Sequence, residues 1–530
     1  MSKEFDIVVI GAGHNGLIAA CYLAKAGLNV CIVEQGKKVG GGTVTAEVTA
    51  PGFKSELASM AHQFLQFSPM LQQDELKLKS KYGLEYIINM DEQVACLFDD
   101  GRSFVVYKDI DRTCAEIEKF SPKDAVTYRK FYEQSSAAFD MLATGSTSPA
   151  PNFGDFISFL DDSEHGQETI KMMFNSSLDI IKPMFESEEV RTYLARYTSE
   201  AMCLPYDNGT GSYLNLMIPS THNYGMAIPK GGSGVLPQKL EQCLLDLGGT
   251  VRTSANVTRI ILSGGKARGV VLDSGEEIVA KRGVISAINV KQVFGKMLKP
   301  SDGVDEGVCK KIQALKPNAF GAFKVHFALK EPIKWKAGVN NPAVNKCMLI
   351  EYDSPSWDNM MHNFMDMYLG NPVSNMFAFA TPSLIDPSRC PEGNAVGEIY
   401  HFQPTELKGG NDRWNQIKDE VTQAMMECVA DKALNFDSNN IIATYSMCPI
   451  DIEKYNPSMI GGDIQFFGTG VTQFFGNRPL PRWNNYKTPV DDLFLVGTST
   501  YPGGGVAGAA RTAMPMICSY LGIDFDAVIR

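Results

Sequence analysis

The chain lacks a Cys-x-x-Cys pair and any cluster of cysteine and histidine, although it contains 12 cysteines in 530 residues. A redox disulfide is therefore not expected, and we interpret the cysteines as reduced, mostly buried thiols of a cytoplasmic protein. The seven histidines show no metal-ligand spacing either. The sequence consequently predicts no metal site.

Long apolar runs and an excess of basic residues are also absent. No uninterrupted apolar stretch approaches the ~18–20 residues that span a bilayer. The net charge of −11 argues against a nucleic-acid partner. We expect the first strand to begin at Phe5, with no signal peptide before it. At 530 residues and 44% hydrophobic content, the chain is too large for one core, so two domains are predicted.

A strand–glycine turn–helix pattern opens the chain. Residues 6–10 form a β-branched run typical of a buried parallel strand. The sequence Gly11-Ala-Gly-His-Asn-Gly16 follows directly, then a predicted helix over residues 17–26 and a second buried strand over residues 29–33. This context favours a dinucleotide site over a chance glycine-rich turn.

Each part of such a motif has a physical task, and the same tasks can be assigned here. Gly11 permits the tight turn, Gly13 lets a pyrophosphate approach the backbone, and Gly16 lets helix and strand pack closely. The helix N-terminus offers free N–H groups to phosphates. Glu34 ends the second strand and can accept hydrogen bonds from ribose hydroxyls. The predicted contacts of this region also include His14, Asn15 and Gln35.

Two further glycine clusters indicate a flavin rather than a simple nicotinamide cofactor. The first, with predicted contacts Gly41, Gly42 and Thr43, follows Glu34 closely and suits the longer body of FAD. The second follows a predicted strand over residues 493–497 and precedes a helix that runs to about Leu521. Its strand–loop–helix order again favours anion binding. The contacts predicted there are Gly497, Gly505, Val506 and Ala507.

These motifs resemble the phytoene desaturase and carotenoid ketolase superfamily of FAD enzymes. The likeness rests on GAGHNGL, on GGGTVTAE, on Pro51-Gly-Phe-Lys54 and on LFLVGTSTYPGGGVAGAA near the C-terminus. Within the superfamily, the chain is most similar to the branch called pyridine nucleotide-disulfide oxidoreductase domain-containing protein 2. The resemblance implies FAD as cofactor and places Val257 against its adenine. The family usually has histidine where Tyr501 stands and Gly-Arg/His-Asn where residues 510–512 stand.

The resemblance implies an α/β fold with interleaved domains. A Rossmann-type FAD-binding domain of the glutathione-reductase type, like that of amine oxidases and phytoene desaturases, is expected in three pieces. An inserted α+β substrate domain is expected in two. The predicted boundaries are 1–90, 221–298 and 458–530 for the FAD domain, and 91–220 and 299–457 for the substrate domain. Residues 91–216 are expected to be largely helical, with one helix over residues 123–142, capped by Ser121 with Pro122 in its first turn, and a loop over residues 144–152. Short strands are predicted over residues 277–280 and 283–286.

The predicted function is removal of hydride from a sizeable apolar substrate by desaturation, oxidation or isomerisation, with oxygen or a quinone reoxidising the flavin. A quinone acceptor would favour transient contact with a membrane surface. A flavin amine oxidase and a flavin-binding protein with an interaction role are the alternatives.

Catalytic residues carry a weaker signal than cofactor residues do. Tyr501 precedes the last glycine loop, His62 lies where the chain leaves the first flavin segment, and Arg511 follows the last loop. We consider each as a catalytic candidate against a structural role. Arg478 is interpreted as holding the loop before the last strand. The methionine-rich residues 357–368 suit core packing or the wall of a substrate tunnel.

Overall fold

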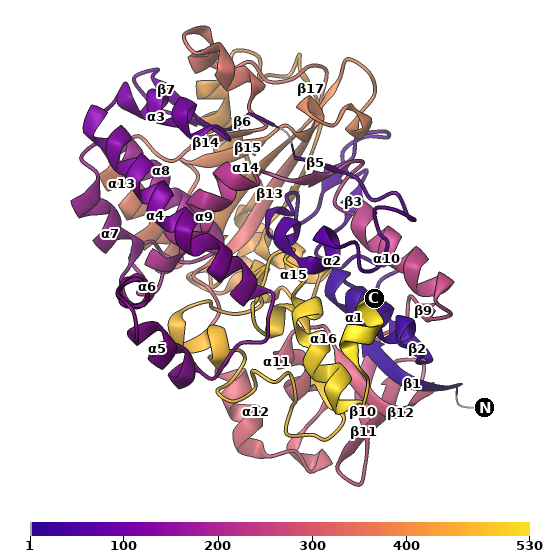
Figure 1. Ribbon diagram of the computed structural model, residues 1–530. Helices are drawn as coiled ribbons and strands as arrows, with labels where there is room; N and C mark the ends of the chain where they lie inside the picture. Colours follow the sequence, from indigo (N-terminus) through magenta and orange to yellow (C-terminus); the bar gives the residue numbers. More distant parts are fainter. Residues whose placement is uncertain (1–2, 89) are drawn as a thin grey trace.

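The computed structural model describes residues 3–88 and 90–530, and most of its strands belong to two seven-stranded sheets (Figure 1). The first sheet lies in the lower right part of Figure 1 and combines pieces from the start, middle and end of the chain. Its strands are β1 (Lys3–Ile10), β2 (Val30–Val33), β9 (Thr250–Arg252), β10 (Val257–Ser263), β11 (Lys266–Leu272), β12 (Glu277–Ser286) and β18 (Leu493–Leu495).

The first sheet is parallel where the glycine motifs adjoin it. β1 pairs in parallel with β12 on one side and with β2 on the other, and β2 pairs in parallel with β9. β18 pairs in parallel with the second half of β12. β10 and β11 form an antiparallel hairpin that pairs with the first half of β12. The sheet orders its main strands as β10-β11-β12-β1-β2-β9. The carboxyl ends of β1, β2 and β18, each followed by a predicted site segment, therefore share one edge.

The prediction of two separate strands over residues 277–280 and 283–286 is wrong, because β12 is continuous through both. β1 pairs with each half of β12, and an irregularity between Phe5 and Ile7 absorbs the change of register. Gly283, at φ +152°, lets the backbone of Asp492 approach closely at this point. A single strand can therefore bridge the hairpin and β18.

Three helices cover one face of the first sheet. α1 (His14–Lys25) packs against both α10 (Val235–Asp246) and α16 (Ala509–Tyr520), and α17 (Phe525–Ile529) closes the chain against it. Leu17, Leu240 and Met514 are fully buried in the shared core. α1 is almost wholly apolar and buried along its length, so it is covered on all sides by the sheet and by the neighbouring helices.

The second sheet lies in the upper part of Figure 1 and is built from two insertions. Its order is β17-β13-β16-β15-β14-β6-β7. Two of its strands, β6 and β7, come from residues 91–216, a segment that we expected to be largely helical. Both are short and stand directly before a long helical stretch. The strands are β6 (Glu92–Leu97), β7 (Ser103–Tyr107), β13 (Phe320–Leu329), β14 (Leu349–Tyr352), β15 (Phe377–Ala380), β16 (Ala395–Pro404) and β17 (Ile441–Met447).

Helices cover both faces of the second sheet. α4, α8 and α9 share a core with one face, and α14 packs on the other. α4 begins as predicted, with Pro122 in its first turn and the Ser121 side chain accepting a hydrogen bond from the Asp124 N–H. It continues to Ser146, into a stretch expected to be loop. The helices of this half are α3 (Ile110–Glu118), α4 (Pro122–Ser146), α5 (Phe153–Asp161), α6 (Glu164–Phe174), α7 (Ser177–Met184), α8 (Glu188–Thr198), α9 (Gly211–Asn223), α13 (Trp357–Tyr368), α14 (Trp414–Lys432) and α15 (Pro449–Tyr455).

The remaining α-helices and β-strands are short. They are the two-stranded pairs β3 (Thr45–Ala46) with β4 (Ser55–Glu56) and β5 (Tyr86–Ile87) with β8 (Ile228–Pro229), and the helices α2 (Pro69–Gln72), α11 (Val290–Gln292) and α12 (Glu306–Gln313). Among the residues described, no helix combines the length and apolarity needed to cross a bilayer. The same residues contain no group of three or more His, Cys, Asp or Glu side chains placed to hold a metal ion.

Candidate functional site

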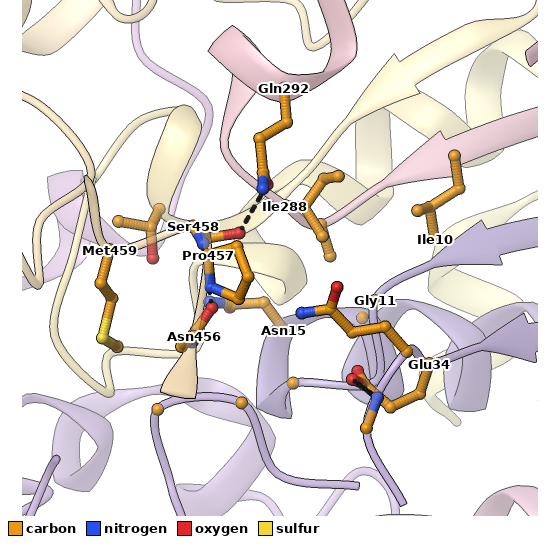
Figure 2. A pocket seen from close by; sticks show the side chains of 18 of the residues that line it. Ile10, Gly11, Asn15, Glu34, Ile288, Gln292, Asn456, Pro457, Ser458 and Met459 are labelled. Carbon is orange, nitrogen blue, oxygen red and sulfur yellow. Dashed lines mark hydrogen bonds between the residues drawn. The ribbon is translucent and has the colours of Figure 1, made fainter. Parts of the chain in front are cut away.

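A cavity of about 780 Å³, here called the glycine cavity, opens at the carboxyl ends of β1 and β2 (Figure 2). Ile10 and Val33 line it where these strands end, and the first two glycine clusters form its adjoining wall. The predicted cofactor residues that line it are Gly11, Gly13, His14, Asn15, Gly16, Glu34, Gln35, Gly41, Gly42, Val257, Gly505 and Val506. Segments far apart in sequence thus meet around one space.

The glycines allow backbones to approach where no side chain fits. A Cβ on Gly16 would lie 2.0 Å from the Gly11 carbonyl oxygen. A Cβ on Gly41, whose φ is +60°, would lie 2.9 Å from the Gly13 Cα. The first two glycine clusters therefore pack directly against each other, and both expose backbone to the cavity.

The N-terminus of α1 and the Glu34 side chain supply the polar groups of this wall. Gly13 is the N-cap of α1 and contributes no side-chain hydrogen bond, and the first turn contains no acidic residue. Its N–H groups are thus available to an anion. The Glu34 carboxylate accepts hydrogen bonds from the N–H groups of Ala12 (2.9 Å) and Gly36 (2.8 Å). These bonds hold the carboxylate at the cavity edge, where Figure 2 shows it beside Gly11.

Three predicted cofactor residues do not line the glycine cavity. The Thr43 hydroxyl donates to the Gly40 carbonyl at 2.7 Å and closes the second glycine loop. A Cβ on Gly497 would lie 2.8 Å from the Asn15 Cβ, so Gly497 permits the packing of α1. Asn15 also accepts a hydrogen bond from the Ala510 N–H at 3.1 Å, which joins the starts of α1 and α16. Ala507 lines a neighbouring cavity.

Sequence reasoning missed one wall of the glycine cavity. It is formed by residues 455–459 and by Gln292, whose side-chain oxygen accepts a hydrogen bond from the Ser458 hydroxyl at 3.0 Å (Figure 2). The Asn456-Pro-Ser turn stood at a predicted domain boundary and lacks a glycine motif. Lys37 and Lys38 also line the cavity, and two adjacent cations after Glu34 were a usable signal for anionic groups.

A second cavity of about 430 Å³, here called the sheet cavity, adjoins the first. The two share Ala58, Ser59, Ile464, Gly505 and Val506 in their walls. Most of the sheet cavity is apolar. The apolar side chains come from α6, from α9, from the segment after β4 and from the segment just before Arg478, and they include Met60, Phe64, Phe67, Met172, Met173, Leu216, Met217, Phe474 and Phe475.

One face of the second sheet forms the floor of the sheet cavity. Alternate residues of adjacent strands point to it, as the period of two requires. They are Val94 on β6, Leu349 and Glu351 on β14, Ala378 and Ala380 on β15, Glu398 and Tyr400 on β16, and Ala322 and Lys324 on β13.

A buried ion pair occupies this floor. Lys324 Nζ lies 3.0 Å from Glu398 Oε1, and both side chains are almost wholly buried. Lys324 also donates hydrogen bonds to the carbonyls of Glu56 (2.7 Å) and Ala58 (2.9 Å). Burial opposes ionisation of Glu398, but Lys324 and His326 outweigh it and lower its pKa. The lysine therefore ties the floor to the place where both cavities meet, and a lysine inside the apolar run 320–329 was a signal that sequence reasoning missed.

The structure places only one of the three catalytic candidates in these cavities. Tyr501 lines the sheet cavity, and burial raises the pKa of its hydroxyl. His62 is buried outside both linings, with its ring nitrogens 2.8 Å from the Tyr86 hydroxyl and 2.7 Å from the Ser233 hydroxyl. Burial lowers its pKa, so the ring is neutral. Arg511 also lies outside both linings and forms an ion pair with the buried Glu75 at 2.7 Å.

Two other candidates have structural contacts. Arg478 is fully buried and donates hydrogen bonds to the carbonyls of Gln465, Gly468, Gln473 and Thr498, which holds the loop before the last glycine cluster. In α13, Met360, Phe364 and Met367 pack into the core beside the second sheet and line neither cavity. Core packing therefore accounts for the methionine-rich segment.

Comparison with known proteins agrees with this geometry. The sequence model of the family described as flavin containing amine oxidoreductase matches residues 16–396. The mouse (Mus musculus) pyridine nucleotide-disulfide oxidoreductase domain-containing protein 2 is 28% identical, over 96% of this chain and 92% of its own length. A component of limonene dehydrogenase from Castellaniella defragrans is 24% identical over 98% and 96%. Phytoene desaturase (lycopene-forming) of Pseudescherichia vulneris is 22% identical over 96% and 97%.

Solved structures share the fold. Cyclohexylamine oxidase from Brevibacterium oxydans superposes with a TM-score of 0.62 at 16% identity, over 99% of this chain and all of that one. The resemblance to the phytoene desaturase superfamily, the Rossmann-type α/β fold and FAD as cofactor are confirmed.

Proposed function

This chain belongs to the flavin-containing amine oxidoreductase family and is an FAD-dependent oxidoreductase, and from that premise we propose that it removes hydride from a sizeable, mainly apolar substrate held in the sheet cavity. FAD, when bound, supplies the electron-accepting chemistry. The chain itself supplies binding, orientation and a dry space.

The glycine cavity suits the adenylate half of FAD. The free N–H groups at the start of α1 fit the pyrophosphate, Glu34 fits the ribose hydroxyls, and Val257 stands at the wall proposed for the adenine. The cavity ends at Gly505 and Val506, where it meets the sheet cavity. We therefore propose that the reactive part of FAD lies at this junction.

The observation that carries the proposal is the apolar wall of the sheet cavity at the junction. Methionine, phenylalanine and leucine side chains from separate elements line the cavity. Such a lining binds an apolar substrate because binding removes apolar surface from water. Burial favours the neutral form of Tyr501, which can therefore donate a hydrogen bond and orient a substrate at neutral pH. Two relatives bear the names limonene dehydrogenase and phytoene desaturase, which are enzymes named for apolar substrates.

An anaerobic reduction screen tests this function. Candidate polyenes, terpenes, fatty acyl compounds, aromatic alcohols and amines are mixed with the yellow holoenzyme without oxygen. We expect loss of the flavin absorbance with an apolar compound. Reduction by amines alone would favour the alternative of an amine oxidase, which the carboxylates of Glu200 and Glu351 in the cavity wall would suit. No reduction by any class would favour an interaction role.

A pair of variants separates the catalytic candidates. Tyr501→Phe should lower turnover about tenfold, the effect of losing one orienting hydrogen bond, and leave flavin content unchanged, because only the hydroxyl in the cavity is lost. His62→Ala should mainly lower the melting temperature and affect turnover little, because it removes buried hydrogen bonds with Tyr86 and Ser233. Full turnover in Tyr501→Phe would contradict the assignment.

The other parts of the proposal follow from the sequence. We keep the domain boundaries 1–90, 221–298 and 458–530 for the FAD domain and 91–220 and 299–457 for the substrate domain, which the composition of the two sheets supports. A cytoplasmic location, reoxidation by oxygen or a quinone, and transient contact with a membrane surface also belong to the proposal.

A further inference from the structure

Glu351 is a carboxylate in the floor of the sheet cavity, and one of its two oxygens has no hydrogen-bond partner among the described residues. It lies on β14, is 1% exposed, and lines the cavity. Its Oε2 atom is buried and accepts no hydrogen bond from any residue that the structure describes. An unsatisfied buried acceptor costs ~1–3 kcal/mol, more when charged. Such a group in a ligand cavity is free to accept a hydrogen bond from a bound donor.

The strand beside Glu351 leaves room for that donor. Glu351 pairs in register with Ala378 on β15, and Ala378 pairs with Tyr400 on β16. Ala378 and Ala380 point to the cavity, while Phe377 and Phe379 of the same strand are buried in the core on the opposite face. The floor is consequently hollow beside the carboxylate, between the larger side chains of β14 and β16.

Arg196 is the cation that acts on Glu351, but it forms its ion pairs with other groups. Arg196 stacks on the Phe402 ring and pairs with Glu200 at 2.5 Å and with Asp353 at 3.7 Å, and its Nε atom donates no hydrogen bond to any residue that the structure describes. It forms no ion pair with Glu351. Burial raises the pKa of Glu351 to about 7, with Arg196 lowering it and Glu200 raising it. The carboxyl group therefore titrates near neutral pH, and its ionised form accepts a hydrogen bond.

We propose that the substrate of this enzyme carries a single hydrogen-bond donor, a hydroxyl or an ammonium group, which binds Glu351 at the sheet floor while the apolar remainder fills the cavity toward Gly505. This inference rests on the proposed function, since it takes the sheet cavity as the substrate cavity. It adds that the substrate is an apolar molecule with one polar end, and that Glu351 sets which end enters first.

Binding of three small probes to the holoenzyme tests the inference without turnover. 1-Octanol and octylamine each carry one donor, whereas octyl methyl ether has a similar apolar body and none. Dissociation constants come from the change in flavin absorbance on titration. In the wild type we expect octanol or octylamine to bind about tenfold more tightly than the ether. The tighter of the two donors identifies the source of the hydrogen bond.

Variants at the floor assign the preference to Glu351. Glu351→Leu should bring the ratio of donor to ether affinity close to one, whereas Glu351→Gln should keep part of it for octanol, because an amide oxygen still accepts. Asp124→Asn is the matched control, because Asp124 is a buried carboxylate that accepts from the N–H groups of Glu186 and Ser187 outside both cavities. It should leave the ratio unchanged.

A further variant keeps the test decisive if Glu351→Leu fails to fold. Ala378→Val fills the hollow and leaves the carboxylate in place, so it should weaken both donors more than the ether. Equal binding of all three probes to the wild type would overturn the inference, as would a preference that survives in Glu351→Leu. The proposed function fails separately, if no apolar compound reduces the flavin, since these probes need only bind.

Discussion

The glycine cavity and the sheet cavity adjoin each other but are built by different means. Most of the glycine cavity that faces α1 presents backbone, namely glycine Cα atoms and the start of α1, together with the strand-end carboxylate of Glu34, and these groups all lie within residues 10–42, while residues 455–459 and Gln292 close the other wall. The sheet cavity presents side chains that alternate along five strands and project from separate helices. Backbone recognition depends on local sequence, whereas side-chain recognition depends on register across the whole sheet.

This difference explains why the two cavities tolerate change differently. A glycine that touches another backbone cannot be enlarged without moving a strand or a helix. A side chain of the sheet cavity can change size or polarity while the strands stay paired. We therefore expect mutations of the glycine cavity to abolish cofactor binding, and those of the sheet cavity to change stability, selectivity or pH response.

The largest effect is expected from Gly13→Val. Gly13 caps α1 and lies close to Gly41 across the junction of the two glycine clusters. A branched side chain there would occupy the space proposed for the pyrophosphate, so nearly all FAD should be lost from the purified protein. The ratio of flavin to protein absorbance measures this. Gly154→Ala is the control, because an added Cβ there meets no atom within 4 Å. Retention of FAD by Gly13→Val would contradict the view that the glycine cavity cannot accept a larger side chain without losing the cofactor.

The cofactor half of the site could be predicted because its signals are contiguous. Gly11, Gly13 and Gly16 have the spacing typical of a turn between a strand and a helix, and Glu34 follows at the distance expected for the end of the next strand. All four residues line one cavity. The residues of the sheet cavity could not be assembled in this way. Glu351, Ala378 and Tyr400 become neighbours only through the pairing of β14, β15 and β16.

Prediction of the fold also failed where strands pair with segments far away in the sequence. β6 and β7 pair with each other, and β6 joins a partner strand about 250 residues further along the chain, which no local pattern reveals. β12 is continuous because β1 and β18 complete its ladder from distant segments. Arg511 lay at a promising spacing from the last glycine loop, yet its nearest anion, Glu75, comes from the other end of the chain.

A smaller effect is expected from Lys324→Met, which tests whether the charges of the sheet cavity hold the structure. Removing one partner of a buried ion pair leaves Glu398 uncompensated and should lower the free energy of unfolding by about 3–5 kcal/mol. Urea denaturation measures the loss. Lys281→Met is the control, because its pair with Glu4 is more than half exposed and should contribute less than about 1 kcal/mol. Equal losses in both variants would show that the floor pair is dispensable.

The smallest effect is expected at Glu351, and its sign depends on pH. The pKa of Glu351 is about 7 in the folded protein, because burial opposes ionisation and Glu200 and Arg196 act in opposite senses on it. Its ordinary value is 4.5. The folded state therefore binds more protons than the unfolded state between these values, and this group makes the wild type less stable as the pH rises through that window.

Glu351→Gln removes this penalty, so its stability relative to the wild type should rise between pH 5 and pH 8, by up to about 3 kcal/mol. Melting temperatures of both proteins at pH 5, 6.5 and 8 measure the difference. Glu398→Gln on the same floor is the contrast, because Lys324 lowers the pKa of Glu398 below its ordinary value of 4.5 and the residue stays ionised throughout this range. Its loss of stability should be nearly constant from pH 5 to 8. If the stability difference between Glu351→Gln and the wild type is also constant over this pH range, the carboxylate must already have a hydrogen-bond partner in the folded protein. The sheet cavity would then offer no free polar group to a substrate and would act as a purely apolar pocket.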